Sequence, residues 1–135
     1  MEPIEHFRPK NPNQSVILLV DDEPMVRNLV RLFLEESGFF ILTASHGEEA
    51  LQLSHEYPGR IDALVTDIMM PKLDGVALRE QILIERPAIK TLFMSGQCQR
   101  AVVGVPFLAK PFKREELIRT VKQLFTPLAA KSAAM

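Results

Sequence analysis

The sequence predicts an α/β fold with a doubly wound, five-stranded parallel sheet. Five short apolar runs alternate with longer stretches whose apolar residues recur at helical spacing. Short apolar runs are typical of parallel strands buried on both faces, and the alternation places helices on both sides of one sheet. Because crossover connections are right-handed, the strand order 2-1-3-4-5 is favoured.

The amino-terminal half of the chain predicts two strand–helix pairs. The unbroken apolar run Val16–Val20 predicts the first strand. Pro24 suits the first turn of the following helix, and Gly38 suits its end. One apolar face of this helix is formed by Val26, Leu29, Val30, Phe33 and Leu34. Phe39–Ala44 then predicts the second strand, and Gly47–His55 the second helix.

The third pair follows a Pro-Gly break. Ala63–Thr66 predicts the third strand, and Asp74 and Gly75 lead into a helix that ends before Pro87. The apolar face of this helix is formed by Val76, Leu78, Ile82 and Leu83.

The last third of the chain predicts strands at Thr91–Met94 and Val105–Ala109, and a helix at Arg114–Phe125. Only residues 96–106 lie between Ser95 and Phe107, and they have to supply a loop, a helix and the return to the sheet. A parallel crossover needs about 10–12 residues with its helix included. The fourth helix is therefore expected to be short or irregular.

Length and composition indicate one soluble domain. The chain has 135 residues, of which 47% are hydrophobic and 24% charged. We expect a flexible leader at residues 1–14, the folded domain at 15–126 and a frayed tail at 127–135. The formal net charge of -1 and the lack of a basic cluster argue against nucleic-acid binding.

Cellular location is also suggested by composition. The chain has one cysteine, Cys98, which we expect to be an incidental loop thiol, and no apolar stretch approaches the roughly 18 residues that span a bilayer. The polar, proline-containing start resembles no secretory signal. A cytoplasmic protein without membrane contact is expected.

Polar residues follow four of the apolar runs. Asp21 and Asp22 follow the first, and Asp67, Ser95 and Lys110 follow the third, fourth and fifth. The carboxyl ends of parallel strands meet at one edge of a sheet, so these groups are expected to converge. Three crowded carboxylates need a cation, and Mg2+ (or Mn2+) suits such oxygen ligands.

This set of groups is suited to phosphoryl transfer. One carboxylate can act as the nucleophile on phosphorus, and the metal can screen the incoming anion. Lys110 would add a point charge and Ser95 a hydroxyl hydrogen bond.

Four motifs in this order resemble the receiver domain of two-component response regulators, over roughly residues 15 to 125. Each motif is weak alone, but together on a βα pattern they are specific. The matching stretches are Val20-Asp21-Asp22-Glu23, Val65-Thr66-Asp67-Ile68-Met69-Met70-Pro71 continuing to Asp74-Gly75, Met94-Ser95-Gly96, and Phe107-Leu108-Ala109-Lys110-Pro111-Phe112.

The resemblance implies roles for the acidic residues and the lysine. Asp67 matches the phospho-accepting aspartate, and Lys110 the invariant lysine. Asp22 matches the direct metal ligand, Asp21 an acidic partner that acts through water, and the main-chain carbonyl of Met69 the third protein ligand.

It also implies a switch. Ser95 matches the hydroxyl that turns towards the phosphoryl group, and Phe107 the aromatic side chain that moves in behind it. Met69 and Gln97 match positions that tune the phosphoryl lifetime, and the apolar Met69 favours a long-lived state. The Lys110-Pro111 bond matches a peptide that is typically cis in the family. The short 96–106 segment puts in doubt the output face that receivers build around their fourth helix.

The resulting hypothesis is a phosphorylation-driven signalling switch and not a conventional enzyme, although it would catalyse its own phosphorylation and dephosphorylation. A histidine kinase or histidine phosphotransfer protein would supply the phosphoryl group, and output is expected through contact with an unknown protein. The chain could be a stand-alone regulator or a receiver excised from a longer chain such as a hybrid kinase, and the sequence leaves both open. The alternatives are a receiver-like scaffold that is never phosphorylated and an aspartyl-nucleophile phosphatase. A flavodoxin-like cofactor binder is disfavoured, because the acids after the first strand would repel a phosphate. Asp21 and Asp22 could also merely cap the first helix.

Overall fold

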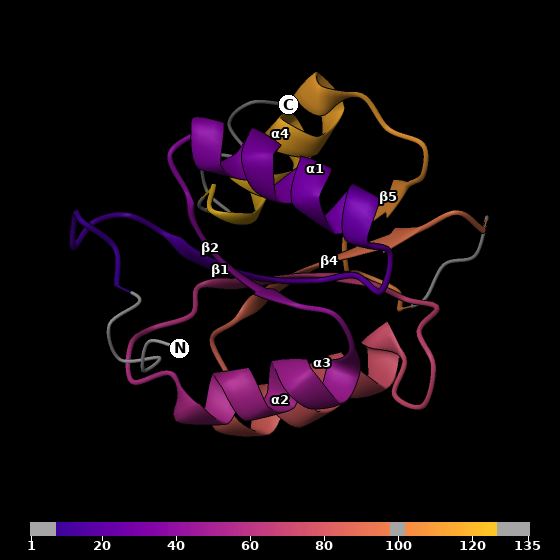
Figure 1. Cartoon of the computed structure of the whole chain (residues 1–135), viewed down its shortest axis with the longest axis horizontal. Coiled ribbons are helices and arrows are strands. Elements are labelled where there is room, and N and C mark those ends of the chain that lie inside the picture. Colours follow the sequence, from indigo (N-terminus) through magenta and orange to yellow (C-terminus); the bar gives the residue numbers. More distant parts are fainter. Residues whose placement is uncertain (1–7, 98–101, 127–135) are drawn as a thin grey trace.

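The computed structural model describes residues 8–97 and 102–126, which form one sheet covered by helices on both faces (Figure 1). The elements are β1 (Val16–Val20), α1 (Pro24–Glu36), β2 (Phe40–Ala44), α2 (Gly47–Glu56), β3 (Ala63–Asp67), α3 (Gly75–Glu85), β4 (Lys90–Ser95), β5 (Phe107–Ala109) and α4 (Arg114–Leu124). The five strands pair in the order β2-β1-β3-β4-β5, and all are parallel. The predicted fold class and strand order are confirmed.

The central strand β1 is buried along its whole length, because helices pack on both of its faces. Ile17 and Leu19 point to the face under α1 and α4, where they join a core that includes Val30 and Leu117. Leu18 and Val20 point to the opposite face and pack with residues of α2 and α3. This two-sided burial explains why the first strand reads as an unbroken apolar run.

The helices begin and end where local chemistry favours it. Asp74 accepts a hydrogen bond from the Ala77 amide at 2.8 Å and so caps α3. His46 caps α2 in the same way, accepting from the Glu49 amide at 3.2 Å. Gly38, with a φ of 97°, follows the end of α1 in the left-handed region that glycine adopts without strain.

The last strand is shorter than predicted. β5 contains Phe107–Ala109 and leaves out Val105 and Pro106. Pro106 has no amide hydrogen to give to a ladder, and the Val105 amide donates instead to the Val102 carbonyl at 3.2 Å. Residues 102–106 form turns, and the described parts of the β4–β5 connection, 96–97 and 102–106, contain no helix. Cys98 lies outside the described residues.

The two ends of the chain are only partly described. Residues 8–14 form a turn in which the Gln14 amide donates to the Asn11 carbonyl at 2.9 Å, and the Gln14 side chain donates to the Gly38 carbonyl. Residues 1–7 and 127–135, which hold most of the expected leader and tail, lie outside the described residues. Within the described ranges, none of the helices has the length and apolarity needed to cross a bilayer.

Candidate functional site

The carboxyl ends of the strands converge on one pocket, as predicted. The pocket has a volume of about 550 Å3. Its lining includes six residues named from the sequence, namely Asp22, Asp67, Met69, Ser95, Gln97 and Lys110. Asp21 is fully buried beneath this surface, where it contacts Lys110. Residues from four separate strand ends therefore meet in one place because the sheet is parallel.

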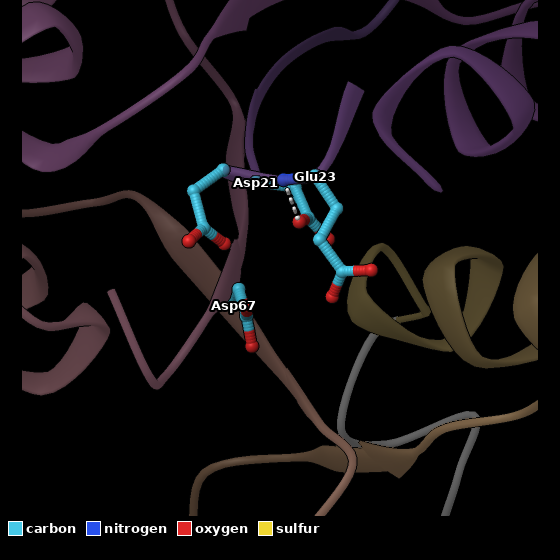
Figure 2. Close-up of side chains that lie close together, drawn as sticks. Asp21, Glu23 and Asp67 are labelled. Carbon is cyan, nitrogen blue, oxygen red and sulfur yellow. Dashed lines mark hydrogen bonds between the residues drawn. The ribbon is translucent and has the colours of Figure 1, made fainter. Parts of the chain in front are cut away.

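Four carboxylates gather at this edge of the sheet. One carboxylate oxygen from each of Asp21, Asp22, Glu23 and Asp67 lies within 4.8 Å of the others. Figure 2 labels three of these residues, Asp21, Glu23 and Asp67. Glu23 was not predicted, although its position directly after the acidic pair was the available signal. The donor set consists of hard oxygen ligands, which suit a divalent cation such as Mg2+.

The acidic pair does not cap α1. The residue before that helix is Glu23, and its side chain makes no capping hydrogen bond. The Asp21 carboxylate instead accepts the Glu23 amide at 2.9 Å, an interaction drawn as a dashed line in Figure 2. Arg27 of α1 donates to the Asp21 carbonyl at 2.8 Å. The capping alternative therefore finds no support in the geometry.

Lys110 connects the acids across the sheet. Its ammonium nitrogen lies 2.8 Å from Asp21 Oδ2, 3.6 Å from Asp67 Oδ2 and 3.9 Å from Glu23 Oε1. Burial alone would lower the pKa of Lys110, but the hydrogen bond and charge of Asp21, followed by the charges of Asp67 and Glu23, raise it above its usual value. Lys110 is therefore a fixed positive charge at neutral pH.

The surroundings of the Asp67 carboxyl raise its pKa. Burial raises its pKa from 3.8 to about 6, with further upward contributions from Asp21 and Asp22, while Lys110 and the Ile68 amide act in the opposite direction. The Asp67 side chain is 8% exposed. The excess negative charge here favours any cation that the cluster can hold.

Backbone contacts fix the end of β3. The buried Thr66 hydroxyl donates to the Asp67 carbonyl at 2.9 Å. The Ile68 amide donates to the Met94 carbonyl of β4 at 3.0 Å, and the Gly75 amide donates to the Ile68 carbonyl at 2.9 Å. Thr66 and Gly75 were not singled out as site residues from the sequence, because their contributions are made through the main chain of a neighbour.

The expected switch residues occupy different environments. Ser95 is buried, and its hydroxyl oxygen accepts the Gln97 amide at 3.1 Å. Phe107 is half-buried on β5, opposite Phe93 of β4, and lies outside the pocket lining. The Lys110-Pro111 peptide is cis, as the resemblance implied.

An apolar wall completes the pocket. Val26 and Leu29 of α1 line it together with Phe112. Leu29 belongs to the apolar face predicted for this helix, but the residue is 50% exposed.

Comparison with known proteins agrees with this geometry. The sequence profile of the response regulator receiver domain matches residues 17–122. The chain is 35% identical over 117 residues to the sensor kinase CckA of Brucella abortus, covering 82% of this chain and 12% of that protein. It is 34% identical over 129 residues to the transcriptional regulatory protein PhoP of Bacillus subtilis, covering 88% of this chain and 52% of that protein. The chain thus spans about half or less of these relatives.

Solved structures give the same result. The receiver domain of the hybrid histidine kinase CckA superposes with a TM-score of 0.74 at 36% identity, covering 83% of this chain and all of that domain. The response regulator TrrA of Thermotoga maritima, solved with Mg2+-BeF, gives 0.72 at 32% identity, covering 82% and 99% of the two chains. These are signalling proteins of two-component systems. The chain belongs to the response regulator receiver domain family.

Proposed function

We propose that this protein is a phosphorylation-driven switch in which Asp67 accepts a phosphoryl group. The observation that carries the proposal is the position of Asp67 within the acidic cluster, with the Lys110 ammonium 3.6 Å from its Oδ2 atom. In the transfer, an Asp67 oxygen forms the new bond to phosphorus. The bond from phosphorus to the donor histidine breaks, and the histidine nitrogen keeps the electron pair and takes up a proton.

The proposed metal is Mg2+, or Mn2+ in its place, and the proposed ligands are Asp21, Asp22, Asp67 and the Met69 carbonyl. Glu23 lies in the same cluster and offers a further carboxylate. When bound, the cation supplies neutralising charge to the acids and to the phosphoryl oxygens. Lys110 lines the pocket and adds a positive charge beside Asp67, where the pairing with Asp21 holds it. This positive charge attracts the negatively charged oxygens of the phosphoryl group.

Ser95 and Phe107 are assigned the switch. The Ser95 hydroxyl is one strand away from Asp67, since Asp67 pairs with Met94 in the β3–β4 ladder. A hydrogen bond from this hydroxyl to a phosphoryl oxygen would bias the domain towards a second conformation, with Phe107 following. Met69 and Gln97 line the pocket and are assigned to the lifetime of the phosphoryl group. The apolar Met69 side chain offers no hydrogen bond to an attacking water, which favours a long lifetime.

The proposed donor is a histidine kinase or a histidine phosphotransfer protein, located with this chain in the cytoplasm. The exposed apolar residues of α1 beside the pocket, Met25 and Leu29, are suited to protein contact. Output is proposed to occur through contact with another protein.

Intact mass after incubation with acetyl phosphate and Mg2+ tests the proposal. One added phosphoryl group is expected on the wild-type protein, and none on Asp67→Asn or after chelation of the metal. A protein that binds no Mg2+ and gains no mass is a receiver-like scaffold. An adduct that persists in Asp67→Asn assigns the acceptor to another residue.

A further inference from the structure

A second cavity lies at the opposite end of β4 from the phosphorylation pocket. Its volume is about 610 Å3, and it shares no lining residue with that pocket. It is bounded by the first residues of β4, by the turn before β5 and by the end of α4. Apolar side chains, including Ile89, Val105 and Phe125, form much of its wall. The polar part is formed by Arg79 of α3 with Lys90 and Thr91 of β4.

Two polar atoms in this lining are buried without a partner. They are Arg79 Nε and Thr91 Oγ1, and among the described residues no group forms a hydrogen bond with either. Thr91 is only 6% exposed. Buried polar atoms in folded proteins are almost always hydrogen-bonded, because an unmade bond costs about 1–3 kcal/mol. Two such atoms in one cavity indicate a ligand that supplies acceptors.

The charge of the lining selects the kind of ligand. Arg79 and Lys90 are both cationic, and neither forms an ion pair with a carboxylate within residues 8–97 and 102–126. The described lining contains no aspartate or glutamate. A guanidinium group matches the planar geometry of a carboxylate, and the Thr91 hydroxyl can donate to the same group. The apolar walls suit a hydrophobic body attached to that anion.

We propose that this cavity binds a small organic carboxylate with an apolar body, which Arg79 and Thr91 hold by hydrogen bonds and Lys90 by charge. The site is separate from the proposed phosphorylation chemistry, so each can be tested without the other. It gives the chain a second input besides phosphoryl transfer.

Titration of the isotope-labelled protein with phenylacetate, followed by amide NMR, tests the site. Saturable shifts are expected at Thr91, Val105 and Phe125, and the neutral analogue phenylacetamide is expected to bind at least roughly tenfold more weakly, since hydrogen bonds to a charged group are the stronger ones. Hexanoate, which has an aliphatic body, is expected to shift the same amides. Equal binding of phenylacetate and phenylacetamide, or no saturable shift with either carboxylate, overturns the proposal.

Arg79→Gln is expected to weaken phenylacetate binding by roughly tenfold or more. The matched control is Arg119→Gln, which removes the same charge from an exposed position on α4 and is expected to leave binding unchanged. Equal effects of the two variants would show a nonspecific charge effect and overturn the assignment. Thr91→Val, which keeps the side-chain shape, is the second variant: weaker binding supports the site, and unchanged binding removes Thr91 from it. If Arg79→Gln does not fold, Thr91→Val and the comparison of carboxylate with amide decide the question.

Discussion

Gly75 packs directly against the main-chain carbonyl of Asp67. A Cβ atom at Gly75 would collide with the Asp67 carbonyl oxygen and lie 3.0 Å from the Ile68 Cα. The colliding atoms belong to the backbone at the end of a buried strand, so they cannot move aside as a flexible side chain would. The first residue of α3 must therefore be glycine for β3 to keep its position beneath the acidic cluster.

Gly75→Ala is expected to destabilise the fold by about 1–3 kcal/mol, as overpacking of a closely packed site does. Urea unfolding measures this change. Gly96→Ala is the control, because a Cβ at Gly96 would meet no atom within 4 Å. Equal stability of the Gly75→Ala and Gly96→Ala proteins would contradict the proposed close contact at Asp67.

The Asp67 carboxyl predicts a pH dependence of stability in the metal-free protein. Its pKa is about 6 in the folded state against an ordinary value of 3.8. The folded protein therefore binds the proton more tightly than the unfolded chain, and this group makes stability fall as the pH rises from about 4 to about 6. Above that window, the ionised carboxylate costs the fold roughly 1–3 kcal/mol.

Asp67→Asn is thus expected to stabilise the metal-free protein at pH 7 and to have little effect at pH 3, where Asp67 is mostly protonated in both the folded and the unfolded state. Denaturant unfolding at both pH values, with a chelator present, measures the difference. Lys110 keeps its partner Asp21 in this variant, so its charge is still paired. A destabilised Asp67→Asn protein at pH 7 would show that the carboxylate is favourable in its present surroundings.

Mg2+ is expected to raise the unfolding temperature by binding only the folded acidic cluster. At a concentration of one hundred times the dissociation constant, the gain is about 2.7 kcal/mol. Asp22→Asn removes one of the four clustered carboxylates and is expected to reduce the gain. Glu115→Gln removes an exposed acid of α4 outside the cluster and should not. A similar loss in both variants would indicate general charge screening in place of a specific site.

Much of the fold and of the site could be predicted because the sequence signals were local. The apolar run Val16–Val20 predicted the bounds of β1 correctly. Asp67 and Lys110 were named because each follows an apolar run, and in the structure they lie 3.6 Å apart. Parallel strands bring their carboxyl ends together, so topology converts separate sequence motifs into one site.

The parts that were missed depend on three-dimensional packing. Leu29 shares the apolar face of α1 and is nevertheless 50% exposed, and the shortened β5 depends on how Val105 uses its amide in a turn. Periodicity reports which residues share a face and not what covers that face. The cavity beside Arg79 has no sequence signal at all, because its lining comes from four separate segments.

Thr66 and Thr91 form a natural pair for measuring what a buried hydroxyl contributes. Both are buried, and they lie on neighbouring strands β3 and β4. The Thr66 hydroxyl donates to the Asp67 carbonyl at 2.9 Å, whereas among the described residues the Thr91 hydroxyl has no partner. Replacement by valine keeps the shape and removes only the polar group.

Thr66→Val is therefore expected to destabilise the protein by about 1 kcal/mol, because it loses the hydrogen bond from the Thr66 hydroxyl to the Asp67 carbonyl. Thr91→Val is expected to stabilise the protein by a similar amount in the absence of ligand, because it removes a buried hydroxyl that has no hydrogen-bond partner among the described residues. Urea unfolding of the two variants beside the wild type gives both values. Opposite signs would show that the Thr91 hydroxyl makes no hydrogen bond in the ligand-free protein, and two destabilised variants would mean that it makes one.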